Sequence, residues 1–200
     1  MSTVNSKGFV VGITGASGAV YGIRLTETLL SLGFPVHLVI SNAGWRVVKE
    51  ELDWDVTDRE GVLNQRFGGL QGTLEYHPVA DIGASIASGS FRTQGMIIMP
   101  CSMGTLSAVA NGTSDNLMTR AADVMLKEGR PLVLVPRETP LHAIHLENML
   151  KLSRLGVRMI PAMPAFYFGP QSLEDMVDFM VGKVLDSFGI DHALFRRWGE

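Results

Sequence analysis

The feature that most constrains this chain is a set of short apolar runs, each followed by a helical pattern. The first run, Phe9 to Ile13, leads through the glycine-rich segment 14–18 into an amphipathic stretch from Ala19 to Leu32, which Gly33 closes. A second apolar run, Val36 to Ile40, follows at once. A helix between two apolar strands is the usual crossover of a parallel pair. The segment therefore predicts a βαβ unit.

The same alternation continues along the rest of the chain. Further apolar strands are expected at Gly95–Met99, Pro131–Val135 and Val157–Ile160, with Pro100 and Pro136 stopping the first two. Helical periodicity fits 42–52, 106–110, 117–126, 141–155 and 173–188, whereas 53–72 is expected to be an irregular surface excursion. The pattern predicts an α/β fold: a Rossmann-like, doubly wound parallel sheet in one domain, residues 1–200.

Composition limits the possible partners and compartments. A chain of 200 residues with a net charge of -3 lacks the basic excess of a nucleic-acid binder. The single cysteine, Cys101, has no disulfide partner, and neither a signal peptide nor an apolar run of about 18 residues is present, so we expect no membrane span and a cytoplasmic protein. The 22 glycines, 11 methionines and positive mean hydropathy favour a homo-oligomer.

Polar groups follow the predicted strands, and ligands of doubly wound sheets bind beyond the carboxyl ends of strands. The loop Gly12-x-x-Gly15-x-x-Gly18 offers backbone N–H groups, the Ser17 hydroxyl and a helix N-terminus, which suit an anion or a polarised ring. A tight turn that needs glycine is the simpler alternative. Ser41 and Asn42 would bind a phosphate or only cap the next helix.

Two later strand ends carry charged or hydroxyl groups. The segment 100–105 has two hydroxyls and free N–H groups at a helix start. Arg120 is a candidate partner for an anion, with a solvated arginine as the alternative. Arg137 and Glu138 place a basic side chain beside an acidic one where a ligand would lie. A surface charge pair is the alternative.

Metal binding and thiol chemistry are not expected. His142 and His145 lie three apart on a predicted helix, but no carboxylate or cysteine completes a ligand set by spacing. Cys101 has no histidine near it in sequence and fits a buried small hydrophobe better than a nucleophile. Trp198 lies near the end of the chain, as an interface plug or as a ring over a neighbour's site.

Motifs spread over about residues 8 to 198 together resemble the flavin prenyltransferase (UbiX) family. They lie at 12–22, 88–93, 100–103, 117–124, 137–142, 164–167 and 197–198. The resemblance implies that FMN is held by Gly15, Ala16, Ser17, Ser41, Ser102, Met103, Gly104, Thr105 and Arg120. It implies that the phosphate of dimethylallyl phosphate meets Ser90, Lys127, Arg137, Glu138, Tyr167 and Lys183. Gly104 and Lys183 depart from the commonest family pattern, and lysine at 183 loses the bidentate phosphate contact of arginine.

The activity implied by the resemblance is transfer of a dimethylallyl group to N5 and C6 of reduced FMN, without a metal. Lys127, Arg137 and Lys183 would stabilise the leaving phosphate while Glu138 donates a proton. Trp198 would offer an aromatic face to the developing allylic cation. Ser17 and Glu51 would assist proton removal from C6.

The resemblance also implies an assembly and a partner. Family sites form where subunits meet, commonly in a dodecamer, so the segment 189–200 is expected to pack on a neighbouring subunit. The product, prenylated FMN, would serve a UbiD-type decarboxylase. Relatives carry an older label, 3-octaprenyl-4-hydroxybenzoate carboxy-lyase of ubiquinone biosynthesis.

Two other functions compete with prenyl transfer. An FMN-dependent decarboxylase of cysteinyl substrates would use a histidine base and a Pro-x-Met-Asn clamp, but here Pro161-Ala-Met is followed by Pro164. A non-catalytic flavin carrier would need the FMN residues but not Glu138, Lys127 or Tyr167.

Overall fold

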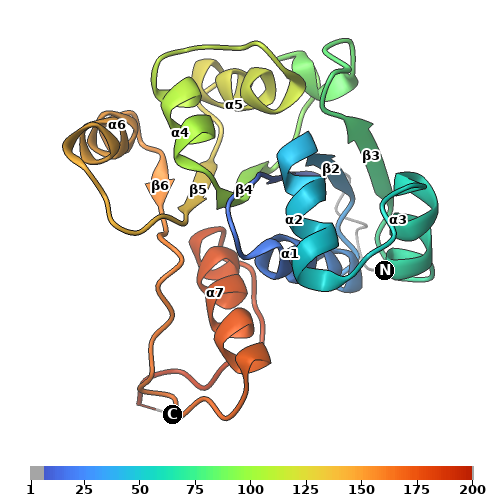
Figure 1. The fold of residues 1–200 in the computed structure, drawn as a ribbon, viewed down its shortest axis with the longest axis vertical. Helices are drawn as coiled ribbons and strands as arrows, with labels where there is room; N and C mark the ends of the chain where they lie inside the picture. The colour runs from blue at the N-terminus through green and yellow to red at the C-terminus, as the bar shows by residue number, and fades with distance from the viewer. Residues whose placement is uncertain (1–6, 200) are drawn as a thin grey trace.

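The computed structural model describes residues 7–199 and is built around one parallel sheet (Figure 1). The strands lie in the order β3-β2-β1-β4-β5-β6, and every neighbouring pair is parallel. This is the predicted Rossmann-like, doubly wound arrangement. The strands are β1 Phe9–Ile13, β2 Val36–Ile40, β3 Leu74–Pro78, β4 Gly95–Cys101, β5 Leu132–Pro136 and β6 Arg158–Met159.

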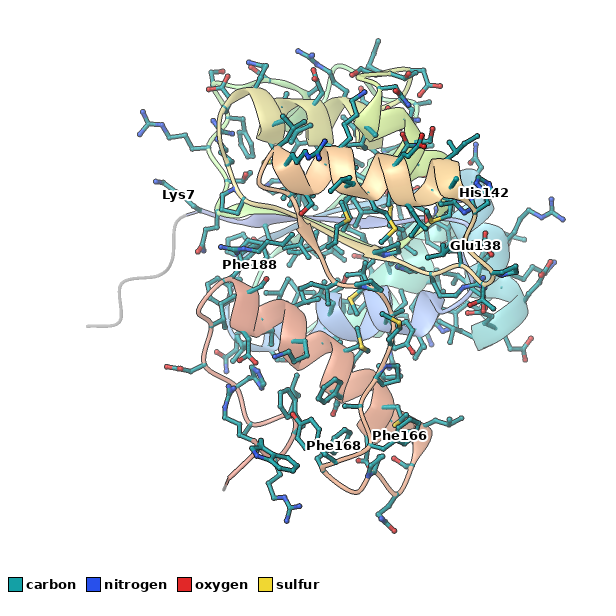
Figure 2. The ribbon with its side chains drawn as sticks, turned by 90° about the vertical axis from the view of Figure 1, so that its left-hand side faces the viewer. Lys7, Glu138, His142, Phe166, Phe168 and Phe188 are labelled. Atoms are coloured by element: carbon teal, nitrogen blue, oxygen red, sulfur yellow. The ribbon has the colours of Figure 1, made fainter. Side chains whose placement is uncertain are left out.

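Helices cover both faces of the sheet (Figures 1 and 2). They are α1 Ala19–Ser31, α2 Asn42–Leu52, α3 Arg59–Phe67, α4 Met103–Ala110, α5 Leu117–Lys127, α6 Ala143–Arg154 and α7 Leu173–Ser187, with a short 3-10 turn, η1, at Ser85–Ala87. Along β1, Phe9 and Val11 face the core under α1 and α7, whereas Val10 faces the core under α4 and α5. The strand is buried on both faces, which explains its uninterrupted apolar sequence.

Several predicted boundaries and one predicted loop are wrong. The segment 53–72 contains helix α3, whose N-cap Asp58 accepts a hydrogen bond from the Gly61 N–H at 2.9 Å, and strand β3 was not predicted. β4 continues through Pro100, and β5 includes Pro136. Helix α4 begins at Met103 and α6 at Ala143, whereas β6 pairs over only two residues.

The chain reverses its winding direction between β1 and β4. From β1 it proceeds to β2 and β3 on one side, then crosses to β4, β5 and β6 on the other. Thr14 joins the two strand ends, because its hydroxyl donates to the Pro100 carbonyl at 2.8 Å and accepts from the Ser102 N–H at 2.8 Å. A switch point of this kind opens the crevice where ligands of such sheets bind.

The C-terminal arm, residues 161–199, extends away from the sheet around α7 (Figure 2). Phe168 stacks on Phe179 with ring centroids 5.1 Å apart, and Phe195 packs on the same ring at 4.9 Å. Segment 189–199 therefore packs on its own α7, at least in part; residue 200 lies outside the described residues. Phe166 and Trp198 are 73% and 80% exposed, so the arm leaves large apolar side chains uncovered.

No helix within residues 7–199 combines the length and the apolar character that a membrane crossing needs.

Candidate active site at the switch point

The loop between β1 and α1 presents free backbone donors. Within residues 7–199, the N–H groups of Gly15, Ala16 and Ser17 have no hydrogen-bond acceptor. Unpaired backbone donors cost free energy unless solvent or a ligand satisfies them, and Ala16 is buried. The loop therefore has the donors that an anionic or polar ligand needs.

Glu51, far away in sequence, closes the start of α1. Its carboxylate accepts from the Gly18 N–H at 2.9 and 3.1 Å and from the Ala19 N–H at 3.0 Å. A negative charge is favourable at this end of the helix dipole. The fold thus places the Glu51 carboxylate on Gly18, the residue next to Ser17. The family resemblance implies that Ser17 and Glu51 act together.

Serine caps begin the helices that follow β2 and β4. Ser41 Oγ accepts from the Gly44 N–H at 2.9 Å, and Ser102 Oγ accepts from the Thr105 N–H at 3.3 Å. The capping alternative for Ser41 is therefore confirmed. It does not exclude a ligand, because the first N–H groups of both helices still lack intrahelical partners and each serine keeps a hydroxyl proton. In Ser102 that proton is directed at Thr105 Oγ1, 3.1 Å away.

Two glycines differ in the space around them. A Cβ atom on Gly15 would lie 2.5 Å from the Cβ of Ala43, so the β1–α1 loop and the start of α2 approach too closely for a side chain. A Cβ on Gly104 would meet nothing within 4 Å. Free donors at three neighbouring strand ends and a loop pressed against α2 fit FMN, whose phosphate and polar ring edge both need N–H groups.

Arg137 and Glu138 follow β5 at the same end of the sheet (Figure 2 labels Glu138). Arg137 Nε donates to the Ser17 carbonyl at 3.2 Å, which joins the β5 end to the β1–α1 loop. Glu138 is exposed, and among the described residues its Oε1 accepts only a local bond from the Thr139 N–H at 3.0 Å. The surface charge-pair alternative is not supported, since Arg137 contacts the loop.

A second group of predicted residues lies around α5. Ser90 Oγ is 2.9 Å from Ser88 Oγ, and a Cβ on Gly89 would lie 2.7 Å from Lys127 Nζ. Lys127 forms an ion pair with Glu128, which lowers the pKa of that carboxyl. Sequence reasoning did not select Glu128, because an acid beside a lysine is common on exposed helix ends.

Arg120 lies on α5 but is paired within the chain. Its Nη1 is 2.9 Å from a carboxylate oxygen of Asp123, and its Nε donates to the Ala87 carbonyl at 3.3 Å. The Arg120 side chain is still 38% exposed, so the alternative of a solvated arginine stays open. A contact from Arg120 to FMN stays a prediction.

A third group lies on the C-terminal arm. The Tyr167 and Trp198 rings meet edge to face with centroids 5.3 Å apart, beside a cavity of about 300 Å³. Lys183 Nζ is 3.8 Å from Asp186. Figures 1 and 2 show α5 and this arm on opposite sides of the sheet. One chain therefore does not bring Lys127 together with Tyr167, Lys183 and Trp198.

Cys101 is buried and is not placed to act as a nucleophile. Among the described residues, His142 and His145 have no third ligand beside them that would complete a metal site. Cys101 is completely buried, and burial raises the pKa of its thiol to about 12, so it stays protonated. The two histidine rings stack with centroids 3.5 Å apart, with His142 as the N-cap of α6.

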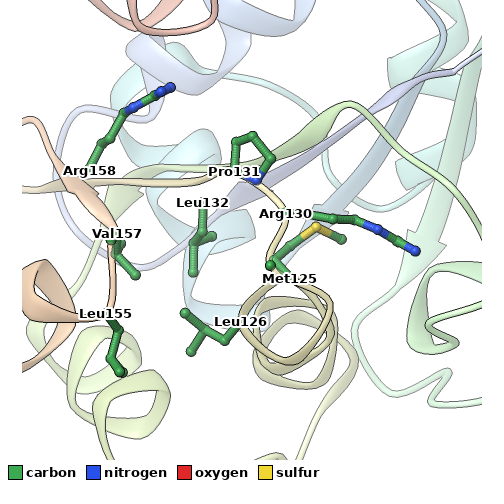
Figure 3. Close-up of a pocket in the computed structure, with 10 residues that line it drawn as sticks. Met125, Leu126, Arg130, Pro131, Leu132, Leu155, Val157 and Arg158 are labelled. Carbon is green, nitrogen blue, oxygen red and sulfur yellow. The ribbon is translucent and has the colours of Figure 1, made fainter.

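A cavity of about 280 Å³ lies at the opposite end of the strands (Figure 3). It is lined by residues that include Pro131 and Leu132 at the start of β5, and Val157 and Arg158 beside them. Because it lies beyond the amino ends of these strands, it is separate from the switch point.

Comparison with known proteins identifies the family. The Flavoprotein family model matches residues 2–185. A flavin prenyltransferase UbiX from Alkalihalophilus pseudofirmus is 58% identical over 200 residues, which cover 100% of both chains. The chain belongs to the UbiX family of flavin prenyltransferases.

Solved structures of this family share the fold. The crystal structure of AnUbiX (PadA1) in complex with FMN and dimethylallyl pyrophosphate is 43% identical, with a TM-score of 0.88 over 97% of this chain and 98% of that one. A dodecameric FMN-dependent UbiX-like decarboxylase from Escherichia coli O157:H7 is 47% identical, with a TM-score of 0.85 over 96% of this chain and 99% of that one.

Proposed function

We propose that this chain transfers the dimethylallyl group of dimethylallyl phosphate to N5 and C6 of reduced FMN, producing prenylated FMN. The observation that carries the proposal is the 58% identity to a flavin prenyltransferase over the complete chain. The chain is thus a prenyltransferase whose acceptor is FMN. The free donors at the ends of β1, β2 and β4 support the same conclusion.

Each group of residues has a distinct task in this proposal. The N–H groups of Gly15, Ala16, Ser17, Met103 and Gly104 hold FMN, together with Ser41, Ser102, Thr105 and Arg120. Reduced FMN supplies the electron-rich nitrogen and carbon that are alkylated. Glu51 is held beside Ser17 by the start of α1, so the pair is placed to accept and relay a proton.

The donor side requires charge stabilisation at a leaving phosphate. Lys127, Arg137 and Lys183 supply positive charge, and Ser90 and Tyr167 supply hydroxyl donors. Glu138 donates a proton to the departing phosphate, since it follows Arg137 directly at the end of β5. Trp198 covers the allyl group with its ring face.

The site is shared between subunits of a homo-oligomer, and we propose a dodecamer. The separation of Lys127 from the C-terminal arm within one chain supports this, because a neighbouring arm must then complete the site. The exposed Phe166 and Trp198 fit an interface. A UbiD-type decarboxylase receiving the product, and a cytoplasmic location compatible with the free thiol of Cys101, belong to the same proposal.

The decisive test incubates the purified protein anaerobically with reduced FMN and dimethylallyl phosphate, and with the diphosphate in parallel. We expect the flavin to gain one C5H8 unit as phosphate is released from the monophosphate or pyrophosphate from the diphosphate. Mass spectrometry reports the flavin, and assays for phosphate and pyrophosphate report the leaving group. Bound but unmodified flavin with both donors would instead support a flavin carrier. Release of carbon dioxide from a cysteinyl peptide would support the decarboxylase alternative.

A further inference from the structure

A second cluster of chemically active side chains lies on the neighbouring strands β2 and β3. His37 pairs in register with Glu75, and His77 lies two residues further along β3, so all three side chains project from the same face of the sheet. His37 Nδ1 lies 3.1 Å from His77 Nε2. One oxygen of the Glu75 carboxylate lies 3.3 Å from His37 Nδ1, and the other oxygen lies 3.6 Å from His77 Nε2. The cluster is not used in prenyl transfer as proposed above.

These separations are close to those between the ligand atoms of a tetrahedral metal site. Zinc binds histidine nitrogen and carboxylate oxygen at about 2.0–2.2 Å, which places the ligand atoms of a tetrahedron roughly 3.3–3.5 Å apart. The two histidine nitrogens are 3.1 Å apart, and each lies 3.3 or 3.6 Å from one of the two Glu75 oxygens, so the separations are close to this range. One ligand atom from each residue lies within 4.8 Å of the other two. Two histidines and one glutamate are also a ligand set that zinc uses, with water in the fourth position.

The surroundings fix the two rings and leave the glutamate accessible. His37 and His77 are 7% and 5% exposed, and the Phe91 ring packs edge-on against His37 at 5.0 Å. Burial disfavours the charged form of both imidazoles and lowers their pKa. The Glu75 side chain is 60% exposed and provides an entry path, and Asp81 adds negative charge near His77.

A purely hydrogen-bonded network satisfies the cluster less well. A bond between the two rings uses one proton and one lone pair, and a carboxylate such as that of Glu75 can only accept hydrogen bonds. A cation satisfies both nitrogens and the carboxylate together. We propose that His37, Glu75 and His77 form a binding site for a divalent transition-metal ion of the zinc type. The ion fastens the edge strand β3 to β2, beneath Phe91 and close to the loop that carries Ser90.

The test uses the complete, assembled protein after removal of metal with a chelator. Titration with zinc chloride should show one bound ion per chain by calorimetry and by elemental analysis after gel filtration. Cobalt(II) should give the intense visible absorption of a tetrahedral site. Loss of a residue that only supports a metal ligand weakens metal binding by roughly 10- to 100-fold. Glu75 is proposed as a ligand itself, so Glu75→Gln should weaken zinc binding by at least that much. Because Glu75 is exposed, this variant keeps the fold, which circular dichroism checks.

Two controls make the result specific. Glu147→Gln removes another exposed carboxylate, and His145→Gln disrupts the other histidine pair; both should bind zinc as the parent does. Absence of stoichiometric binding would overturn the proposal. The proposal would also be overturned if Glu75→Gln bound zinc as tightly as the parent while His145→Gln lost it. The metal would then be bound at His145 on α6.

Discussion

Glu138 shows how one carboxyl group can be tested apart from the scaffold that holds it. It is exposed, and within residues 7–199 its one hydrogen bond is to the neighbouring Thr139 N–H, so no other described element depends on it. Glu138→Gln keeps the shape of the side chain but removes the proton donor. We expect FMN affinity to be unchanged and flavin prenylation to slow by about 10²- to 10⁴-fold, the usual contribution of a general acid.

Single-turnover mass spectrometry of the flavin measures this effect, and flavin fluorescence reports binding. Glu147→Gln on α6 is the matched control and should react at the parental rate. An unchanged rate in Glu138→Gln would remove this residue from the mechanism. Equal losses of FMN binding and of rate would assign it to flavin binding instead.

At the residue scale, the structure also decides between alternative roles that the sequence left open for single residues. Cys101 is a buried thiol whose pKa is raised to about 12, as expected for a small hydrophobe. Ser41 is confirmed as a helix cap. The structure adds most about Glu51, whose bonds to Gly18 and Ala19 depend on the packing of α2 beside α1. A contact between such distant positions cannot be read from spacing along the chain.

At the element scale, the close approach of the β1–α1 loop to α2 can be tested with two glycines. Gly15→Ala places a methyl group 2.5 Å from the Ala43 Cβ, which must displace the loop or the helix start. We expect a loss of about 1–3 kcal/mol in the free energy of unfolding, typical of overpacking, and weaker FMN binding. Gly104→Ala meets no atom of the described residues within 4 Å and should leave the free energy of unfolding unchanged or slightly higher.

Urea denaturation and flavin titration of the two variants provide the comparison. Equal stability of Gly15→Ala and Gly104→Ala would show that the loop relaxes freely. The FMN site would then not depend on close contact between this loop and α2.

The elements that the sequence predicted are those with strong apolar patterns. Strands β1, β2, β4 and β5 are buried on both faces, so their apolar runs are unambiguous. Strand β3 was missed because it is an edge strand that alternates with polar side chains, and α3 because only Leu63 and Phe67 of its nine residues are buried. Since Glu75 and His77 lie on β3, the same omission concealed the histidine cluster.

At the scale of the whole molecule, the proposed site requires more than one chain. Lys127 on α5 and Tyr167 on the C-terminal arm lie on opposite sides of the sheet (Figures 1 and 2), yet both are expected to bind the phosphate of the donor. If different subunits supply them, Lys127→Ala and Tyr167→Ala should each be inactive alone. Mixed oligomers should regain activity, because about a quarter of the sites in a random equal mixture then contain both native residues.

Co-expression of the two variants with different affinity tags, followed by sequential purification, yields such mixed oligomers. Their prenylation rate per site should approach a quarter of the parental rate, whereas the separately purified variants mixed without exchange should stay inactive. The double variant, Lys127→Ala with Tyr167→Ala in one chain, co-expressed with the parent gives the matched reference for subunit mixing. Mixed oligomers without activity would place both residues in the site of a single chain, and the neighbouring arm would then have no part in binding the donor.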